Sequence, residues 1–383
     1  MKSQGKRGSC GGGRREAFER GLAALTAGGQ LCRARPPRYT ARTMPKPSPR
    51  TVPDSRRAAN SSPPVDQIIQ GDSVELLNRW PEGWADLCFA DPPFNIGYLY
   101  HGYDDAKDVH EYLDFSERWM RGVYRALKPT GSFYLAIGDE FAADLCVIAR
   151  RKIGFHLRNW IVWHYTFGQQ TKKMFAKSHT HILYFCKHKP DSGLTNITFN
   201  ADAVRVASAR QTTYGDARAN PKGKLPDDVW YLRPQEAVDA GEAYFAPESD
   251  TWNVSRVCGT FKEREGWHGC QMPIAVLNRI IKASSNPGDV VFDPFNGSGT
   301  TVVSAAMLGR RYLGIDQSEQ YVAFARQRLA HALSVKPAGE DESRLEAVVQ
   351  DTARASRRMT GTDALGRPRV PRTRAGRSLT VSA

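Results

Sequence analysis

Short apolar runs alternate with amphipathic stretches along residues 67–333. Runs of strand length occupy 67–70, 85–90, 132–139, 289–293 and 311–316. They show no alternation of polar and apolar positions, which indicates strands that helices cover on both faces. Apolar residues at helical spacing occupy 108–127, 273–284, 300–308 and 318–333. Strands that alternate with helices predict an α/β fold with a doubly wound, mainly parallel, Rossmann-like sheet.

Three regions modify this regular pattern. Lys-Pro-Thr-Gly at 128–131 predicts the end of the helix before the strand that begins at 132. The apolar runs 159–165 and 179–187 follow one another without a helix, so we expect a reversed, antiparallel hairpin at one edge of the sheet. Residues 190–262 are polar with scattered aromatic residues, and form either a small appended domain or a set of long loops.

The net charge of +14 lies in the two ends of the chain. Residues 1–62 carry +11, residues 336–383 carry +4, and the stretch 63–335 carries −1. Proline, glycine, serine and arginine dominate both ends, so we predict disordered basic tails around a folded domain at 63–335. Such tails add non-specific attraction to phosphates, and the total charge alone decides no function. Met44 is a second candidate for the start of translation.

Composition excludes several classes of protein. No apolar run approaches the roughly 18 residues of a membrane span. The glycine-rich, basic start lacks the apolar segment of a secretory signal. Seven scattered cysteines without a Cys-x-x-Cys pair indicate neither a zinc site nor a disulfide framework. We expect buried thiols, no bound metal and a reducing, cytoplasmic setting.

A glycine loop stands between a strand and a helix in Phe-Asp-Pro-Phe-Asn-Gly-Ser-Gly-Thr-Thr, residues 292–301. Gly297 and Gly299 allow a ligand to approach the backbone closely, and the helix start offers free N–H groups. Asp316 ends the next strand, where a carboxylate accepts hydrogen bonds from ribose hydroxyls. Val302 replaces the third glycine of the dinucleotide fingerprint, and no phosphate-binding P-loop sequence exists. S-adenosylmethionine, a nucleoside without phosphates, is therefore the expected ligand.

The segment Asp91-Pro92-Pro93-Phe94 follows another buried strand. The amino group of a nucleobase is a poor nucleophile, because its lone pair is conjugated into the ring. The Asp91 carboxylate and the Pro92 carbonyl offer two acceptors that would free this lone pair, and the proline rings hold both acceptors still. Phe94 offers a ring for stacking on the base. Catalysis by such a segment rests on orientation and polarisation.

These motifs resemble those of the amino-group DNA methyltransferases, which act on adenine N6 or cytosine N4. The family's catalytic tetrapeptide has Asp, Asn or Ser before Pro-Pro and an aromatic residue, as at 91–94. Its cofactor motif, D-P-F-x-G-S-G-T-T, matches 293–301 with Asn296 at the free position. The catalytic motif comes first, which is the order of the circularly permuted β-class. The family's H-P-x-Q-K-P reads His-Gly-Cys-Gln-Met-Pro at 268–273, so Gly269 and Met272 depart from the commonest form.

The resemblance covers about residues 66–333 and implies roles for individual residues. Asp91, Pro92, Pro93 and Phe94 would surround the target amino group. The implied cofactor-binding residues are Asp72 near the adenine, Asp316 at the ribose, and around the methionine part Asp293, Pro294, Phe295, Gly297, Ser298, Gly299, Thr300, His268, Gln271 and Pro273.

The resemblance also implies double-stranded DNA as substrate, with the target base flipped out of the duplex. Target recognition would fall within 190–262, and residues 169–177 would face the extruded base or its backbone. The family includes dimers and enzymes with a companion restriction endonuclease. The candidate cations for DNA contacts are Lys172, Lys173, Lys177, Arg205, Arg210, Lys222, Lys224 and Arg233.

Three alternatives stay open at the level of sequence. The first is the same reaction on cytosine N4, although Asp91 at the first motif position favours adenine. The second is an RNA methyltransferase or a protein-glutamine methyltransferase, and the order of the motifs argues against the glutamine enzymes. The third is a DNA-binding relative without catalysis, which we would expect to have lost the acid or the glycines.

Overall fold

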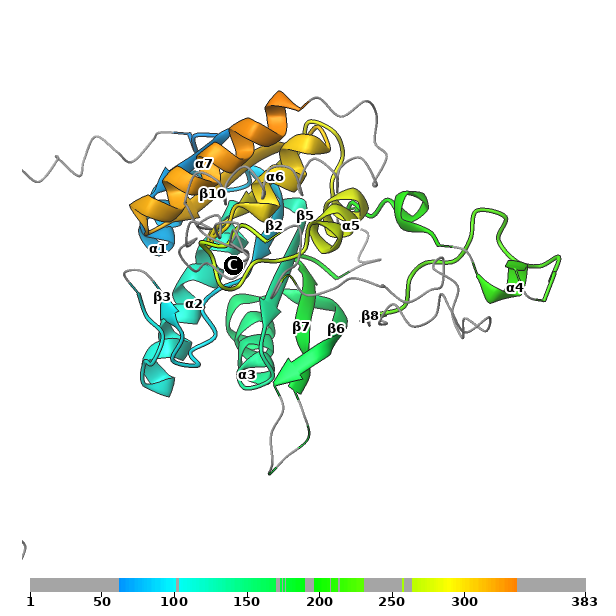
Figure 1. The fold of residues 1–383 in the computed structure, drawn as a ribbon, viewed down its shortest axis with the longest axis horizontal. Coiled ribbons are helices and arrows are strands. Elements are labelled where there is room, and N and C mark those ends of the chain that lie inside the picture. Colours follow the sequence, from blue (N-terminus) through cyan, green and yellow to red (C-terminus); the bar gives the residue numbers. More distant parts are fainter. Residues whose placement is uncertain are drawn as a thin grey trace, which may run out of the picture. The chain divides into compact units, whose positions relative to one another are not determined.

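The computed structural model describes residues 62–100, 103–169, 173, 175, 177–189, 196–206, 208–212, 214–230, 257 and 264–335. All of them belong to one compact unit, Asp54–Ala383, and are drawn in colour in Figure 1. The predicted tails 1–62 and 336–383 lie outside the described residues, apart from residue 62.

An eight-stranded sheet organises the described residues, in the order β1-β10-β9-β2-β5-β7-β6-β8 (Figure 1). Its strands are β1 (Gln67–Gln70), β2 (Ala85–Ala90), β5 (Leu127–Ile137), β6 (His156–Gln169), β7 (Lys177–Cys186), β8 (Val229–Trp230), β9 (Val290–Asp293) and β10 (Arg311–Asp316). Its first five strands in this order, β1, β10, β9, β2 and β5, pair in parallel, whereas β7 is antiparallel to both β5 and β6. The prediction of an α/β sheet with a reversed hairpin is confirmed. The hairpin is not the edge, however, because the two-residue strand β8 pairs with β6 outside it.

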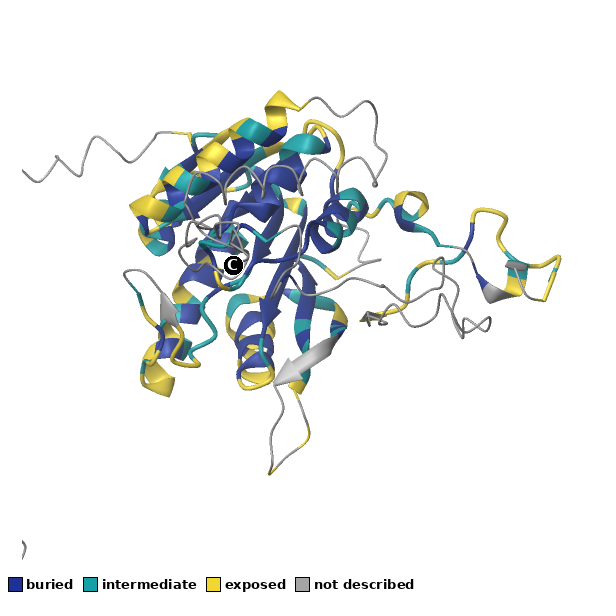
Figure 2. Cartoon of the chain, in the orientation of Figure 1, coloured by how far each residue is buried: buried dark blue, intermediate teal, exposed yellow. Residues whose placement is uncertain are grey.

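Helices cover both faces of this sheet, and the strands between them are buried (Figure 2). On one face α1 (Ser73–Arg79), α2 (Val109–Ala126), α3 (Ala142–Val147) and the π-helix Ile148–Ile153 share an apolar cluster with the strands. There Trp119 of α2 packs edge-on against Phe133 of β5. On the other face α5 (Ile274–Ser284), α6 (Thr300–Met307) and α7 (Glu319–Ser334) form two further clusters. Among the helices of the described ranges, none has the length and hydropathy to cross a bilayer.

The strand β5 begins earlier than the sequence predicts. Residues 128–131 end the helix as expected, since α2 stops at Ala126. They do not form a separate break, because β5 already starts at Leu127, which pairs with Ala85. The Lys128 ammonium group binds both carboxylate oxygens of Asp86 on β2, each at 2.8 Å. This ion pair across two adjacent strands fixes a segment that its proline and glycine would otherwise leave irregular.

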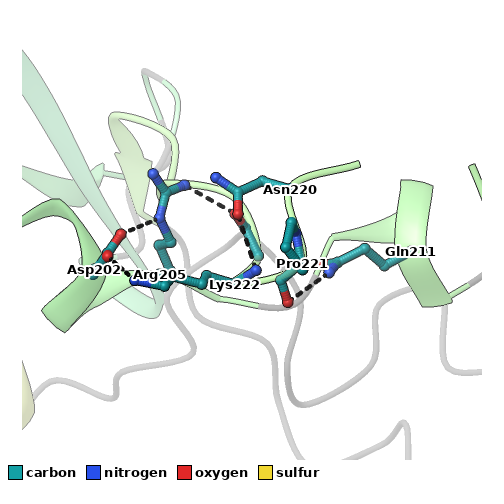
Figure 3. A network of polar contacts seen from close by, with 7 residues as sticks. Asp202, Arg205, Gln211, Asn220, Pro221 and Lys222 are labelled. Carbon is teal, nitrogen blue, oxygen red and sulfur yellow. Dashed lines mark hydrogen bonds and ion pairs between the residues drawn. The ribbon is translucent and has the colours of Figure 1, made fainter. Parts of the chain in front are cut away.

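The described parts of 190–262 contain a 3-10 helix (Ala201–Val204), the short helix α4 (Ala209–Thr212) and β8. A network of polar contacts ties the 3-10 helix and α4 to the loop at residues 221–223 (Figure 3). Asp202 accepts from Arg205 at 2.8 Å and also from Lys222, while the Gln211 amide donates to the Pro221 carbonyl at 3.1 Å. The remaining residues of this segment, 190–195, 207, 213, 231–256 and 258–262, lie outside the described residues.

Parallel pairing brings four chain segments to one edge of the sheet. At this edge β1 leads into Gly71 and Asp72, and β2 leads into Asp91. Likewise β9 leads into Pro294, and β10 leads into Gln317. In open α/β sheets ligands bind at this edge. A small antiparallel pair, β3 (Leu99–Tyr100) with β4 (Tyr103–Asp104), follows the loop after β2.

Candidate active site

A pocket opens at this edge of the sheet, and most of the predicted site residues line it. They come from the loops after β1, β2, β9 and β10 and from the segment before α5. The predicted residues that line the pocket are Asp72, Asp91, Pro93, His268, Asp293, Pro294, Phe295, Gly297, Ser298, Thr300 and Asp316. The fold therefore joins the two motifs, which are far apart in the sequence, around one cavity.

Five predicted residues do not line the pocket. Pro92 is buried. Phe94 packs against the apolar cluster that α1, α2 and α3 share with the strands. Its ring lies so close to Gly138 that a Cβ there would be 3.2 Å from it. The Gln271 side chain turns to the backbone and accepts from the Glu265 N–H at 2.9 Å. Pro273 precedes α5, and Gly299 caps α6 with a φ of +78° that favours glycine.

Two carboxylates shape the glycine loop from within. Asp293 accepts from the Phe295 N–H at 2.9 Å and from the Thr301 hydroxyl at 2.6 Å. Asp316 accepts from the Gly297 N–H at 2.9 Å and from the Ser318 N–H at 2.8 Å. Each oxygen of Asp316 thus has one protein donor and retains a lone pair for a second donor.

Burial changes the protonation of both carboxylates. The pKa of Asp293 rises to about 7, mainly because of burial and with a small addition from the like charge of Asp316, while the hydrogen bonds from Thr301 and Phe295 oppose the rise. Burial also raises the pKa of Asp316, where the N–H groups of Ser318 and Gly297 oppose the shift. The floor of the pocket therefore favours a cationic ligand, which would stabilise the ionised carboxylates.

The loop after the Asp-Pro-Pro-Phe segment is held by a residue that the sequence did not single out. The buried Asp105 carboxylate accepts from the backbone N–H groups of Asn95 at 2.8 Å, Ile96 at 3.2 Å and Tyr98 at 2.9 Å. Asn95 adopts a φ of +58°, a conformation that asparagine tolerates better than most residues. These bonds fix the path of the chain just beyond Phe94.

The segment 268–273 packs against the glycine loop. His268 is buried, and a Cβ on Gly297 would lie 2.8 Å from its Nε2 atom. Burial, together with a smaller effect of the Arg328 charge, lowers the pKa of His268 to about 4, so the ring is neutral near pH 7. Both departures from the commonest motif have a structural reason. A side chain on Gly269 would overlap the Tyr98 hydroxyl, and Met272 is buried in an apolar cluster.

Asp72 has two structural partners besides its place on the pocket. As the N-cap of α1 it accepts from the Glu75 N–H at 3.0 Å, and its other oxygen accepts from the Gln317 amide at 2.9 Å. A helix cap explains this aspartate without any ligand.

Sequence reasoning missed twelve further residues that line the pocket. Most are neighbours of motif residues in the chain, whereas Tyr103 and Phe115 come from β4 and α2, where no local signal marked them. These residues are Ser73, Val74, Phe89, Tyr103, Phe115, Cys270, Met272, Asn296, Thr301, Gln317, Ser318 and Tyr321.

Within residues 190–262, each fully described candidate cation has a carboxylate partner. Arg205 and Lys222 bind Asp202, Arg210 binds Asp216 at 3.0 Å, and Lys224 binds Asp227 at 3.1 Å. On the hairpin, Lys177 pairs with Asp139 at 3.2 Å and Lys173 is exposed. Lys172 and Arg233 lie outside the described residues. The aspartate partners therefore offset most of the positive charge that these cations would offer to DNA phosphates.

Comparison with known proteins adds an independent line of argument. The family model described as DNA methylase matches residues 85–327. The Type II methyltransferase M.HpaI of Haemophilus parainfluenzae is 32% identical over 264 residues, which cover 69% of this chain and 74% of the relative. The DNA adenine methyltransferase YhdJ of Escherichia coli (strain K12) is 33% identical over 270 residues, which cover 68% of this chain and 82% of the relative.

Among solved structures, the cytosine-N4-specific PvuII DNA methyltransferase aligns with a TM-score of 0.50. The alignment covers 78% of this chain and 95% of that chain at 17% identity. At this level of identity the likeness concerns the fold, and it agrees with the Rossmann-like sheet described above.

Proposed function

Because this chain belongs to the DNA methylase family and is an S-adenosyl-L-methionine-dependent DNA methyltransferase, we propose that it methylates the N6 amino group of adenine. One observation carries this proposal. Asp91 and Pro93 line the same pocket as the glycine loop that runs from Asp293 to Thr301. A methyl acceptor held at the first segment and a donor held at the second would therefore meet in one cavity.

The residues around the pocket suit S-adenosyl-L-methionine. When bound, it supplies an electrophilic methyl group on a positively charged sulfur. Gly297 and Gly299, with φ values of +45° and +78°, let the backbone approach the methionine part closely. The free lone pairs of Asp316 would accept from the ribose hydroxyls, and Asp72 would face the adenine. His268 would contribute a neutral ring beside the methionine moiety.

Asp91 and its prolines would act on the target base. The Asp91 carboxylate and the Pro92 carbonyl would accept from the two N–H bonds of the amino group and direct its lone pair at the methyl carbon. The Pro93 carbonyl accepts from the Tyr112 hydroxyl at 2.8 Å, which leaves the Pro92 carbonyl as the neighbouring acceptor. Phe94, supported at Gly138, would stack on the flipped base after a small movement toward the pocket.

Adenine is favoured over cytosine because aspartate occupies the first position of the tetrapeptide. The name of the relative YhdJ, a DNA adenine methyltransferase, supports the same choice. We further infer the permuted β-class from the order of the motifs, and target recognition by residues 190–262. The cytoplasmic setting, a homodimer and a companion restriction endonuclease stay predictions.

The test uses the purified full chain with unmethylated genomic DNA and S-adenosyl-L-methionine, followed by mass spectrometry of the nucleosides. We expect N6-methyladenine to rise, and we expect Asp91→Ala to abolish the rise without loss of cofactor binding. N4-methylcytosine in its place would overturn the choice of base and leave the site intact. Full activity of the Asp91→Ala variant would overturn the assignment of the catalytic segment.

A further inference from the structure

A buried ion pair lies behind the glycine loop. The guanidinium of Arg328 on α7 and the carboxylate of Glu265 approach to 2.9 Å, and both side chains are completely shielded from water. The same guanidinium donates from Nη1 to the Ser298 carbonyl at 2.8 Å and to the Thr300 hydroxyl at 2.9 Å. One side chain therefore holds two residues of the glycine loop and one residue of a separate segment.

Glu265 belongs to the segment that carries His268. Its N–H donates to the Gln271 side chain at 2.9 Å, so the residues 265–271 form a closed turn. Inside this turn His268 packs against Gly297, with Nε2 at 2.8 Å from the position of a Cβ there. Both walls of the pocket thus depend on Arg328, the loop directly and the His268 segment through Glu265.

The arrangement is an unusual way to obtain stability alone. Two charges lose their hydration on burial, and an apolar pair of similar volume often stabilises a fold equally well. What an apolar pair lacks is direction. A guanidinium has several donors in a fixed geometry, so it sets the distance between three chain segments. Contacts between methyl groups have no preferred direction and would not fix that distance. The loop also contains Gly297 and Gly299, whose backbone freedom makes an external support useful.

We propose that Arg328 and Glu265 form a positioning pair that holds the glycine loop and the His268 segment at the separation that binds the methyl donor. The proposal rests on the proposed cofactor site. Neither residue lines the pocket, so both act through Ser298, Thr300 and His268. Loss of the pair would weaken binding of the donor and raise its KM, while kcat at saturating donor would change little.

The test measures binding of S-adenosyl-L-methionine and S-adenosylhomocysteine to the full chain by calorimetry. Arg328→Met alone leaves Glu265 buried and unpaired, so this variant loses both stability and affinity. The double variant Arg328→Met with Glu265→Leu removes both charges and should recover thermal stability. We expect its dissociation constant for both ligands to stay about tenfold above the parent value, within the usual range of coupling between sites.

Arg326→Met is the matched control. Arg326 lies on the same helix and donates twice to the Ile68 carbonyl of β1, at 2.8 and 2.6 Å, away from the glycine loop. Its loss should leave ligand affinity unchanged. The proposal is overturned if the stable double variant binds both ligands as tightly as the parent, or if Arg326→Met weakens binding equally. A parent chain that binds neither ligand would instead refute the cofactor site itself.

Discussion

The hydroxyl of Tyr112 donates to the carbonyl oxygen of Pro93 at 2.8 Å, and the tyrosine is fully buried in α2. The bond ties the Asp-Pro-Pro-Phe segment to the helix that supports it. Since proline has no N–H, the segment offers few groups for such an anchor. Polarisation of the amino group depends on the fixed orientation of the Pro92 and Pro93 carbonyls. The hydrogen bond from the Tyr112 hydroxyl thus helps to keep that orientation.

Tyr112→Phe should therefore slow methyl transfer without weakening cofactor binding. The variant keeps the ring in its cluster and removes one hydrogen bond, whose net worth of about 1 kcal/mol corresponds to roughly a fivefold fall in kcat. Single-turnover kinetics on DNA and calorimetry with S-adenosyl-L-methionine would measure the two effects separately. Tyr124→Phe on the same helix is the control, and an equal fall in kcat there would refute a specific role for Tyr112.

Asp105→Asn should disturb the loop beyond Phe94 more strongly. Its carboxylate accepts three backbone N–H groups, and an amide in its place would turn an NH2 group toward at least one of them. We expect kcat to fall by about ten- to a hundredfold, since an unsatisfied buried donor costs about 1–3 kcal/mol. Asp104→Asn is a close control, because that side chain accepts from the nearby Ala106 N–H at 3.1 Å and from none of the three N–H groups that Asp105 holds. Similar losses in both variants would contradict the proposed support.

The sequence predicted those parts of the fold and site that depend on neighbouring residues. The apolar runs predicted β1, β2, β9 and β10 nearly in extent, and β5, β6 and β7 in type with ends that differ by several residues. The short strands β3, β4 and β8 were not predicted. The glycine loop stood out because Gly297, Gly299 and Asp316 have a recognisable spacing. The helix predicted from residue 318 is α7, and Ser318 caps it by accepting from the Tyr321 N–H at 3.3 Å. These features can be recognised in the sequence because the residues that interact are close together along the chain.

Other features depend on partners far along the chain and left no local signal. Asp105 reads as a surface acid in a polar loop, and its burial follows only from the return of the chain over residues 95–98. Arg328 stands on an amphipathic helix where an arginine usually faces water. Its partner Glu265 follows a stretch without any periodic pattern. The early start of β5 likewise required Asp86 on the next strand to hold Lys128.

Asp293 and His268 give the stability of the chain pH dependences of opposite sign. The pKa of Asp293 rises from 3.8 to about 7, so its contribution is present below about pH 4 and is lost as the pH rises through 7. The pKa of His268 falls from 6.5 to about 4, so its contribution is present above about pH 6.5 and is lost as the pH falls through 4. The two effects offset one another over most of the interval between.

Single substitutions should separate these two effects. Asp293→Asn removes the cost of a buried carboxylate at high pH. The Tm of this variant relative to the parent Tm should therefore increase as the pH rises from 5 to 8. The Tm of His268→Gln relative to the parent Tm should increase as the pH falls from 6.5 to 4, because this variant lacks the ring that resists protonation. Thermal denaturation at matched ionic strength measures both. Curves of Tm against pH that run parallel for the parent and Asp293→Asn would contradict the raised pKa.

Gly269 and Tyr98 should be energetically coupled, because a side chain at 269 would occupy the place of the tyrosine hydroxyl. The Tyr98 N–H is held by Asp105, so the backbone at residue 98 stays in place and the ring has to move to make room. We expect Gly269→Ala to lower kcat/KM for DNA by about threefold or more, a modest cost because the tip of a tyrosine can shift. Combining it with Tyr98→Ala should cost less than the sum of the two single changes, since the second substitution opens the space that the first one needs. Purely additive free energies in this double-mutant cycle would show that the contact between the two loops does not constrain the active site.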